Sequence, residues 1–372
     1  MTNVVIVDVR GVITKSGPDV LFRHVQYADA LARLDSKSRL IILSRNKGRY
    51  DLLSKNIEII SEKSLLNYFR KGFKLFRSLN ENTLLVSGDP WESYLASLIL
   101  RKFTSKHLPI QVQLHADVGS SSWRSLNGRN RIRALFLSYS LNRAETIRCV
   151  STSQLTNLER ISPGVSSKTE VIPVPIQFDY DLEQNKKRQK KVAIAIVGRI
   201  HKDRGLEEFV RICKILKKSF RSLKIYVIGE GPHEEWLRTA LQKDNLLKSS
   251  IFTGQMNQKE LSLMWKNFGC IASLAPSEAY GRSARESLVY GVPVLATRSS
   301  GLVGLEEVFG GNGIWFLDGL DDKQVTELFK HMTGFIVPDY VRDSIINEVK
   351  SLDDELAKSW IKGSRLHRQT TK

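Results

Sequence analysis

The chain has 372 residues, of which 41% are hydrophobic and 26% are charged, a balance typical of globular proteins and not of disordered ones. At this length two domains of about 170 residues each are the default expectation. The formal net charge is +18, and +12 of it lies in residues 1–176. Such a charge favours nucleotide phosphates, anionic lipid headgroups or nucleic acid as partners, although lysines and arginines that only maintain solubility would give the same count.

The N-terminal residues 1–8 enter an apolar run at once, without the basic region and cleavage site of a signal peptide. No stretch approaches the roughly 18 apolar residues of a membrane-spanning helix. The three cysteines, Cys149, Cys213 and Cys270, each lie in an apolar segment and lack the spacing of metal ligands. We therefore expect a cytoplasmic protein with reduced, buried thiols.

Short apolar runs alternate with amphipathic stretches along nearly the whole chain. Runs of this kind, rich in β-branched residues, indicate βαβ units with parallel strands that are buried on both faces. Two successive series predict an α/β protein made of two Rossmann-like domains. The expected strands are 4–7, 40–43, 84–86, 110–114, 147–151 and 171–174 in the first series, and 192–197, 224–228, 251–253, 270–274, 292–296 and 314–317 in the second.

The domain boundary is expected at residues 171–175, where Pro173 and Pro175 end regular structure ahead of the charged run 181–191. Near the C-terminus, Leu356 and Trp360 lie four residues apart, as on one face of a helix. The predicted parts are an acceptor-binding domain (residues 1–176), a donor-binding domain (177–350) and a helix within 351–372 that packs back toward the first domain.

The segment 275–296 carries the most specific chemistry. A strand ending at Leu274 precedes a turn and a helix that begins near Gly281 and stops at Gly291. The start of a helix leaves N–H groups without intrahelical partners, here those of Gly281, Arg282 and Ser283. Together with the helix dipole, these amides predict a site for an anion such as phosphate.

Two carboxylates, Glu278 and Glu286, flank this predicted anion site. A carboxylate repels a diphosphate, so both side chains are better suited to accept hydrogen bonds from hydroxyl groups. A ribose and a hexose joined by two phosphates would supply hydroxyls on both sides. The alternative is structural: Glu278 caps the helix, and Glu286 is a solvated helical residue.

Glu278 and Glu286, separated by seven residues and followed by Gly291-Val292-Pro293, resemble the E-x7-E signature of glycosyltransferase family 4. The resemblance implies retaining enzymes with the GT-B fold, two facing Rossmann-like domains with the active site in the cleft between them. It covers residues 165–320 closely and the N-terminal half only loosely. Four further elements follow in the family's order: Val197-Gly198-Arg199, Arg204-Gly205, Gly229-Glu230-Gly231-Pro232 and Phe252-Thr253-Gly254.

The resemblance assigns the donor site residue by residue. Arg199 and Arg204 would bind the donor diphosphate together with the helix start at residues 281–283, and their bonds would strengthen as the leaving group gains charge. Glu286 would bind the ribose hydroxyls. The loop formed by Phe252, Thr253 and Gly254 would contact the base of a UDP-sugar or GDP-sugar.

Two residues are candidates for catalysis. Glu278 would bind hydroxyls of the transferred sugar and stabilise positive charge at its anomeric carbon, and His115, at the end of the strand 110–114, would contact the reacting sugar or the acceptor. No Asp-x-Asp pair stands beside these elements, so we expect no metal and no cofactor. Retention of configuration is implied by the resemblance alone.

Two basic stretches, 63–79 and 122–143, place apolar residues at helical spacing beside lysines and arginines. Such helices can lie on an anionic membrane, which would suit a lipid-linked acceptor in cell-envelope or exopolysaccharide synthesis. They can equally cover a sheet with their basic faces in solvent.

The competing functional class is a basic protein that binds nucleotides or nucleic acid without transfer activity. The positive charge favours it, but no RNA-binding strand pattern, zinc site or recognition-helix pattern is present, so we expect no nucleic-acid partner. The expected partners are a nucleotide-sugar, a saccharide or lipid-linked acceptor, and the inner face of the cytoplasmic membrane.

Overall fold

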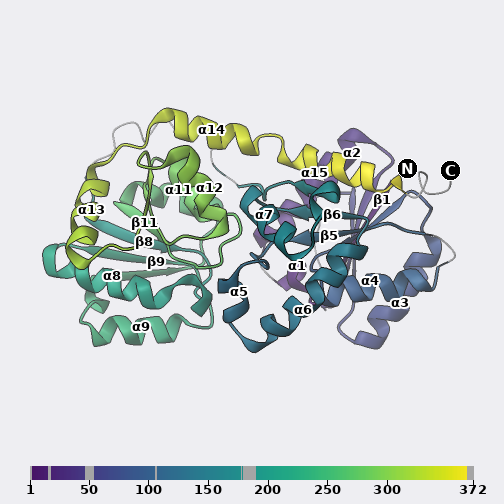
Figure 1. The fold of residues 1–372 in the computed structure, drawn as a ribbon, viewed down its shortest axis with the longest axis horizontal. Coiled ribbons are helices and arrows are strands. Elements are labelled where there is room, and N and C mark those ends of the chain that lie inside the picture. Colours follow the sequence, from purple (N-terminus) through teal and green to yellow (C-terminus); the bar gives the residue numbers. More distant parts are fainter. Residues whose placement is uncertain are drawn as a thin grey trace. The chain divides into compact units, whose positions relative to one another are not determined.

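The computed structural model describes residues 2–15, 18–46, 54–104, 107–176, 178 and 190–366. The chain divides into two compact units, of which the first is Met1–Pro175 with Lys350–Lys372 and the second is Ile176–Val349 (Figure 1). The predicted linker 181–191 lies almost entirely outside the described residues. Each unit is built on its own parallel sheet.

The first unit contains a seven-stranded sheet in the order β3-β2-β1-β4-β5-β6-β7. All of its strand pairings are parallel. The order reverses between β1 and β4, as in a Rossmann-like sheet. Its strands are β1 (Asn3–Asp8), β2 (Arg39–Ser44), β3 (Ile57–Ser61), β4 (Thr83–Ser87), β5 (Ile110–Leu114), β6 (Thr146–Cys149) and β7 (Thr169–Val171).

Helices cover both faces of this sheet. Side chains of α3, α4, α6 and α7 share one hydrophobic core with the strands, whereas α2 and α15 pack on each other and on the opposite face. The C-terminal helix α15 therefore belongs to the first unit. The helices are α1 (Val12–Lys15), α2 (Pro18–Leu34), α3 (Leu65–Ser78), α4 (Glu92–Lys102), α5 (Ser121–Ser125), α6 (Gly128–Arg143), α7 (Thr152–Ile161) and α15 (Leu352–Gly363).

The second unit contains a six-stranded parallel sheet in the order β10-β9-β8-β11-β12-β13. Its order reverses between β8 and β11. The strands are β8 (Ala193–Val197), β9 (Lys224–Ile228), β10 (Ser250–Gly254), β11 (Cys270–Ser273), β12 (Val294–Ala296) and β13 (Ile314–Phe316).

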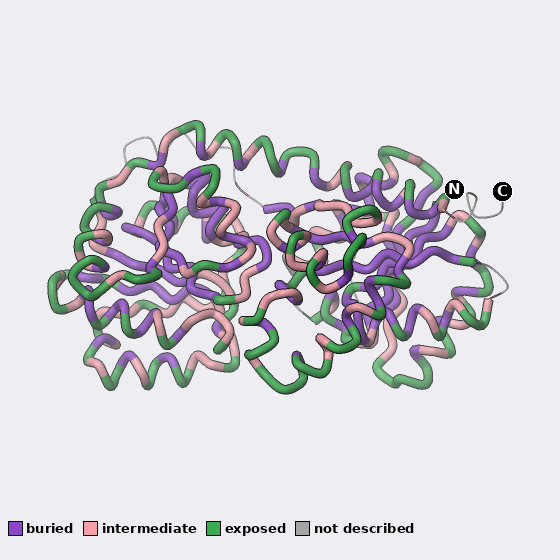
Figure 2. The backbone as a smooth tube through the Cα atoms, viewed as in Figure 1, coloured by how far each residue is buried: buried purple, intermediate pink, exposed green. Residues whose placement is uncertain are grey.

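The core of the second unit joins the sheet to α8, α9 and α13, while α11 and α12 pack against the strands beside α14. The inner strands of both sheets are buried along nearly their whole length, whereas the edge strands β3, β7, β10 and β13 are only partly buried, and the outer helices alternate between buried and exposed residues (Figure 2). The helices are α8 (Leu206–Ser219), α9 (Glu234–Lys243), α10 (Gln258–Met264), α11 (Arg282–Val289), α12 (Ser300–Phe309), α13 (Asp322–Gly334) and α14 (Asp339–Val349).

Every expected strand is present, and the structure differs from the expectation in two main respects. The structure adds the edge strand β3, which has one buried residue among its five. Strand β7 ends at Val171, before the prolines, and not at residue 174. The three cysteines are buried free thiols, as expected.

Candidate donor site at the switch point of the second sheet

The candidate site of the second unit lies where β8 and β11 are neighbours and the strand order reverses. Open α/β sheets bind ligands outside the carboxyl ends of their strands at such a switch point. Two loops leave this edge, one after β8 and one after β11. They carry the predicted residues Arg199 and Arg204 on the first loop and Glu278 on the second.

A glycine brings these two loops together. Gly205 follows the short 3₁₀ helix η3 (Lys202–Arg204) and has a φ of 69°, in the left-handed region. A Cβ atom at this position would lie 2.3 Å from the carbonyl oxygen of Leu274, at the end of β11. Only glycine permits this approach, and it places Arg204 against Glu278.

Arg204 and Glu278 form an ion pair, with 2.6 Å between Nη1 and Oε2. The other carboxylate oxygen of Glu278 accepts a hydrogen bond from the backbone N–H of Gly281, at 3.2 Å. The side chains remain 36% and 19% exposed, so both can still be reached from solvent. A carboxylate offers about four lone-pair positions, and these two bonds leave acceptor capacity for a ligand hydroxyl.

The start of α11 adds amide donors beside this pair. Gly281 adopts a left-handed conformation as the N-cap residue and has no side chain of its own to cap the helix, whereas Glu278, which accepts from the N–H of Gly281, caps the helix start as the structural alternative supposed. The first N–H groups of a helix have no intrahelical partner, and here they belong to Arg282 and Ser283. The structure thus brings Arg204, Glu278 and Gly281 together at a helix start with positive electrostatic character.

Glu286 lies one turn inside α11. Its Oε1 is 3.2 Å from Nη2 of Arg282, and its side chain is only 7% exposed, compared with 35% for Arg282. Glu286 is therefore not the solvated helical residue that the structural alternative supposed.

Arg199 does not reach Glu278. Its Nη2 lies 3.3 Å from Oδ2 of Asp203, while the other oxygen of Asp203 lies 2.8 Å from Nδ1 of His201. The Arg199 side chain is 60% exposed. An exposed ion pair of this kind contributes little energy, so it restrains Arg199 only weakly.

The predicted base-binding loop also lies where strands of this sheet end. It is formed by Phe252, Thr253 and Gly254 at the end of β10, two strands away from β8. The guanidinium of Arg238 stacks 3.7 Å from the centroid of the Phe252 ring. The carbonyl of Gly254 accepts a hydrogen bond from the N–H of Gly229, at 2.9 Å.

Sequence reasoning missed three residues that support the Glu278 loop. Arg285 is buried and donates to the carbonyl oxygens of Tyr280 and Gly301, and its guanidinium lies 3.7 Å from the centroid of the Tyr280 ring. The hydroxyl of Tyr280 donates to Glu348 of α14, at 3.2 Å. Burial raises the pKa of Tyr280, which keeps this donor protonated. The only signal for Arg285 was its position between Ala284 and Leu288 on the apolar face of the helix.

His115 belongs to the first unit, where it follows β5. Its Nε2 lies 3.1 Å from Oε1 of Gln113. The residue is exposed as a whole, although Gln113 beneath it is only 7% exposed. His115 and Glu278 thus belong to different units of the chain.

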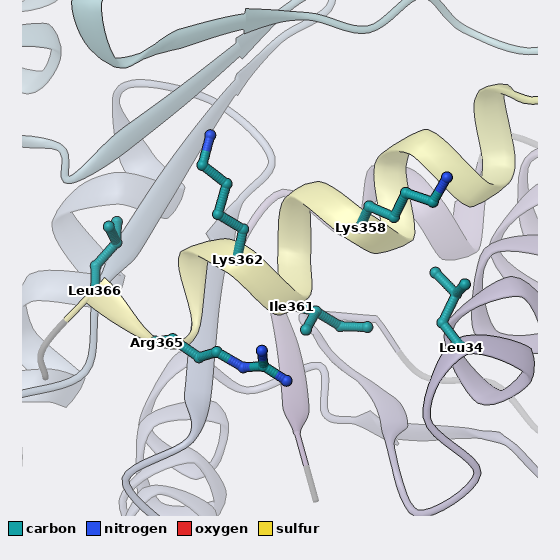
Figure 3. A pocket seen from close by; sticks show the side chains of 6 residues that line it. All are labelled: Leu34, Lys358, Ile361, Lys362, Arg365 and Leu366. Atoms are coloured by element: carbon teal, nitrogen blue, oxygen red, sulfur yellow. The ribbon is translucent and has the colours of Figure 1, made fainter.

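A separate pocket, with a volume of about 480 Å³, lies along α15 in the first unit. Figure 3 shows the side chains that line it, which are Leu34, Lys358, Ile361, Lys362, Arg365 and Leu366. None of the predicted site residues is among them. Lys362 is already engaged by Glu170, at 2.8 Å.

Within the described part of the chain, no three histidine, cysteine or acidic side chains are grouped closely enough to hold a metal ion. Over the same residues, no helix has both the length and the apolar character needed to cross a membrane.

Comparison with known proteins gives the fold and the family. The family model described as "Glycosyl transferases group 1" matches residues 177–366. The 2-deoxystreptamine N-acetyl-D-glucosaminyltransferase of Niallia circulans is 27% identical over 111 residues, which are 30% of this chain and 28% of that protein. The matched part spans less than half the length of such curated relatives.

Two solved structures resemble the whole chain. The sucrose-phosphate synthase of Thermosynechococcus elongatus has a TM-score of 0.73 at 17% identity, covering 100% of this chain and 99% of that one. HepE of Anabaena in complex with UDP-glucose has a TM-score of 0.71 at 15% identity, covering 96% and 99%. These likenesses confirm the predicted α/β class and the GT-B fold, with its two Rossmann-like domains. Because this family model matches more than half of the chain, the chain belongs to the glycosyl transferases group 1.

Proposed function

We propose that this protein transfers a hexose from a UDP-sugar or GDP-sugar to a saccharide or lipid-linked acceptor, with retention of configuration and without a metal ion. Membership of the glycosyl transferases group 1 supports the reaction class. The observation that carries the proposal is the Arg204–Glu278 pair at the start of α11. It places a cation, a carboxylate and free amide donors at one switch point.

The cationic part of this site suits the diphosphate. Arg204 and the amides of Arg282 and Ser283 would donate hydrogen bonds to the phosphate oxygens, and Arg199 would turn from Asp203 to join them. Their bonds strengthen as the nucleoside diphosphate gains negative charge on leaving. Such donors supply the stabilisation that a bridging metal gives in other transferases.

The carboxylate part suits the sugar. Glu278 would accept hydrogen bonds from hydroxyls of the hexose and stabilise positive charge at its anomeric carbon. Glu286 would exchange its contact with Arg282 for the ribose hydroxyls. His115 would contact the reacting sugar or the acceptor from the other domain.

The strand order supports an extended nucleotide along this edge. Neighbouring strands lie about 4.8 Å apart, so the end of β10 is about 10 Å from the end of β8. Phosphates at the β8–β11 switch point would therefore leave the base near Phe252, Thr253 and Gly254. HepE, which shares the fold, has been solved with UDP-glucose bound.

We further propose that the first domain binds an anionic membrane, which would bring the enzyme to a lipid-linked acceptor in cell-envelope or exopolysaccharide synthesis. Helix α6 leaves Ile132, Leu135, Phe136 and Tyr139 exposed, with exposed fractions of 42–79%. The same stretch carries exposed arginines, of which Arg129 pairs with Glu92; these are Arg124 of α5 and Arg129, Arg131 and Arg143 of α6. This combination of apolar and cationic side chains suits an anionic lipid surface on the cytoplasmic side.

In helix α3, the other basic stretch, Leu65 and Leu66 are exposed but the aromatic residues are not. Phe76 is fully buried, and Phe69 and Phe73 pack against the core of the first unit. Its aromatic face therefore covers the sheet, as in the alternative considered for this stretch.

The test is a panel of UDP-sugars and GDP-sugars offered to the full-length protein, first by thermal shift and then by product formation with and without EDTA. One donor should raise the melting temperature and be turned over equally in both conditions. Loss of turnover in EDTA would remove the metal-independent mechanism. Binding to random oligonucleotides that free UDP and GDP leave unchanged, with no turnover of any donor, would favour the nucleic-acid-binding alternative.

A further inference from the structure

Strand β5 carries a row of polar side chains on one face of the first sheet. Side chains alternate along a strand, so Gln111, Gln113 and His115 share a face. Gln111 is fully buried, Gln113 is 7% exposed, and the neighbouring Arg148 of β6 is 1% exposed. Buried polar groups of this kind need defined hydrogen-bond partners.

Helix α15 fixes the orientation of the first amide. The indole Nε1 of Trp360 lies 3.0 Å from Oε1 of Gln111. An indole N–H can only donate, so this atom of Gln111 must be the carbonyl oxygen. Its amide nitrogen then donates to Oγ of Ser359, at 3.1 Å.

Arg148 fixes the orientation of the second amide in the same way. Its Nη1 lies 3.4 Å from Oε1 of Gln113, and a guanidinium has donors only. The amide nitrogen of Gln113 is left to donate to Oε1 of Gln111, at 3.4 Å. The hydrogen bonds that run from α15 through Gln111 to Gln113 therefore have one consistent set of donors and acceptors.

This series of hydrogen bonds determines which nitrogen of His115 carries the proton. Oε1 of Gln113 is an acceptor, and Nε2 of His115 lies 3.1 Å from it. A neutral imidazole has one donor nitrogen and one acceptor nitrogen, and the partner of one decides the role of the other. Nε2 must donate, which leaves Nδ1 with its lone pair.

We propose that Gln113 is a positioning residue that, oriented by Arg148, holds His115 as the Nε2–H tautomer and presents Nδ1 as a hydrogen-bond acceptor. The consequence for catalysis depends on the proposed function, in which His115 contacts the reacting sugar or the acceptor. In that role, Nδ1 would accept a hydrogen bond from a substrate hydroxyl.

The surroundings of His115 favour its neutral form. Although the residue keeps an exposed face, its pKa is lowered, first by desolvation and then by the positive charges of Arg148 and Arg23. Arg148 itself is anchored by the carbonyl oxygens of Ile172 and Pro173, at 2.9 and 2.8 Å. The cation that orients Gln113 therefore also disfavours protonation of the imidazole.

The test is nitrogen NMR of the ligand-free, full-length protein labelled with ¹⁵N-histidine, because long-range ¹H–¹⁵N correlations identify the protonated ring nitrogen. The His115 signals are assigned by their loss in His115→Gln. We expect only the Nε2–H tautomer for His115 at pH 7.5. His24 is the internal control, since its Nδ1 lies 2.7 Å from the carbonyl of Val20 and must donate to it.

Two replacements of Gln113 separate positioning from packing. Gln113→Met removes the acceptor at similar volume, and we expect the mixture of tautomers that a free imidazole shows in water. Gln113→Glu keeps an acceptor facing Arg148 and His115, so we expect the Nε2–H tautomer to persist. The tautomer of His24 should be unchanged in both variants.

The proposal is overturned if wild-type His115 shows the Nδ1–H tautomer or a mixture, or if Gln113→Met leaves its signals unchanged. If Gln113→Met does not fold, the wild-type tautomer and Gln113→Glu still decide the question. In turnover assays, Gln113→Met should lower kcat about 10-fold or more while the donor KM stays the same. Absence of any turnover in the wild type would refute the proposed function without touching the tautomer result.

Discussion

Arg204 and Glu278, 74 residues apart in the sequence, form an ion pair of 2.6 Å at the ends of two neighbouring strands. The two side chains were predicted to bind different parts of one donor, and the structure shows them bound to each other. Each side chain thus neutralises the charge of the other. A donor would replace both halves of the pair at once, phosphate at Arg204 and hydroxyl at Glu278.

Removal of either partner should therefore impair turnover far more than stability. We expect Arg204→Gln and Glu278→Gln each to lower kcat/KM by about 10²- to 10³-fold, as when one preorganised group is lost from a charged transition state. The measurement is steady-state kinetics with the donor identified by the panel.

Matched controls lie on the same unit. Arg211→Gln removes an exposed arginine paired with Glu208 at 2.7 Å, and Glu235→Gln changes an exposed glutamate of α9. Both controls should retain wild-type kinetics. If Glu278→Gln turned over the donor as the wild type does, the donor site would have been assigned to the wrong residues.

Much of the fold was predictable because its signal is local. Buried parallel strands are short apolar runs, and nearly all of them were found from such runs. Strand β3, with the sequence Ile-Glu-Ile-Ile-Ser, escaped because an edge strand is only partly buried and tolerates a charge among its apolar residues. The limit of β7 was misjudged because Pro173 and Pro175 cannot donate to a ladder, so the strand ends before them.

The site was predictable only in its local part. The segment from Glu278 to Glu286 is continuous, and its turn and helix could be placed from glycines and spacing. The pairing of Glu278 with Arg204 could not be, because it depends on the approach of Gly205 to Leu274. Arg285 and Glu348 were missed for the same reason, since their contacts join α11 to a helix some sixty residues further along the chain.

The approach of Gly205 to Leu274 can be tested by stability. Gly205→Ala would place Cβ 2.3 Å from a carbonyl oxygen at a φ of 69°. We expect a loss of free energy of unfolding of about 1–3 kcal/mol from the left-handed backbone, with a further loss from the steric overlap. The measurement is urea unfolding of the full-length chain.

Gly311→Ala is the control for this substitution. Gly311 also has a left-handed φ, of 74°, but a Cβ there would meet nothing within 4 Å. Gly311→Ala should therefore lose only the free energy that the left-handed backbone costs an alanine, and it should be less destabilised than Gly205→Ala. Equal losses for the two variants would mean that the two loops do not meet as described.

His24 makes stability depend on pH. The pKa of His24 is lowered from 6.5 to about 4, first by desolvation and then by the charges of Arg23 and Arg148, against the Val20 carbonyl, which raises it. The unfolded chain therefore binds a proton between pH 6.5 and 4 that the folded chain does not. Stability is fully present above pH 6.5 and falls as the pH falls through this window, by at most about 1.4 kcal/mol per pH unit.

Replacement of His24 should flatten this dependence. We expect His24→Gln to reduce the drop in melting temperature between pH 6.5 and 4.5, because no proton is then taken up at this position on unfolding. His107→Gln, an exposed histidine of the same unit, should keep the wild-type drop. If the melting temperature of His24→Gln fell with pH as steeply as that of the wild type, groups other than His24 would take up the proton.

Membrane binding through α6 is the remaining prediction. Leu135 is 79% exposed among arginines, so it would enter the interface while the arginines bind anionic headgroups. Sedimentation with phosphatidylglycerol vesicles at low salt should show binding that phosphatidylcholine vesicles do not support. Since burial of a leucine is worth about 1.5–3 kcal/mol, Leu135→Asp should weaken this binding about 10-fold or more.

Leu263→Asp is the control, at a leucine of α10 that is 57% exposed in the other unit, and it should bind as the wild type does. Equal binding by Leu135→Asp and the wild type would exclude α6 as the contact, because the charged substitution removes both the apolar side chain and part of the positive field.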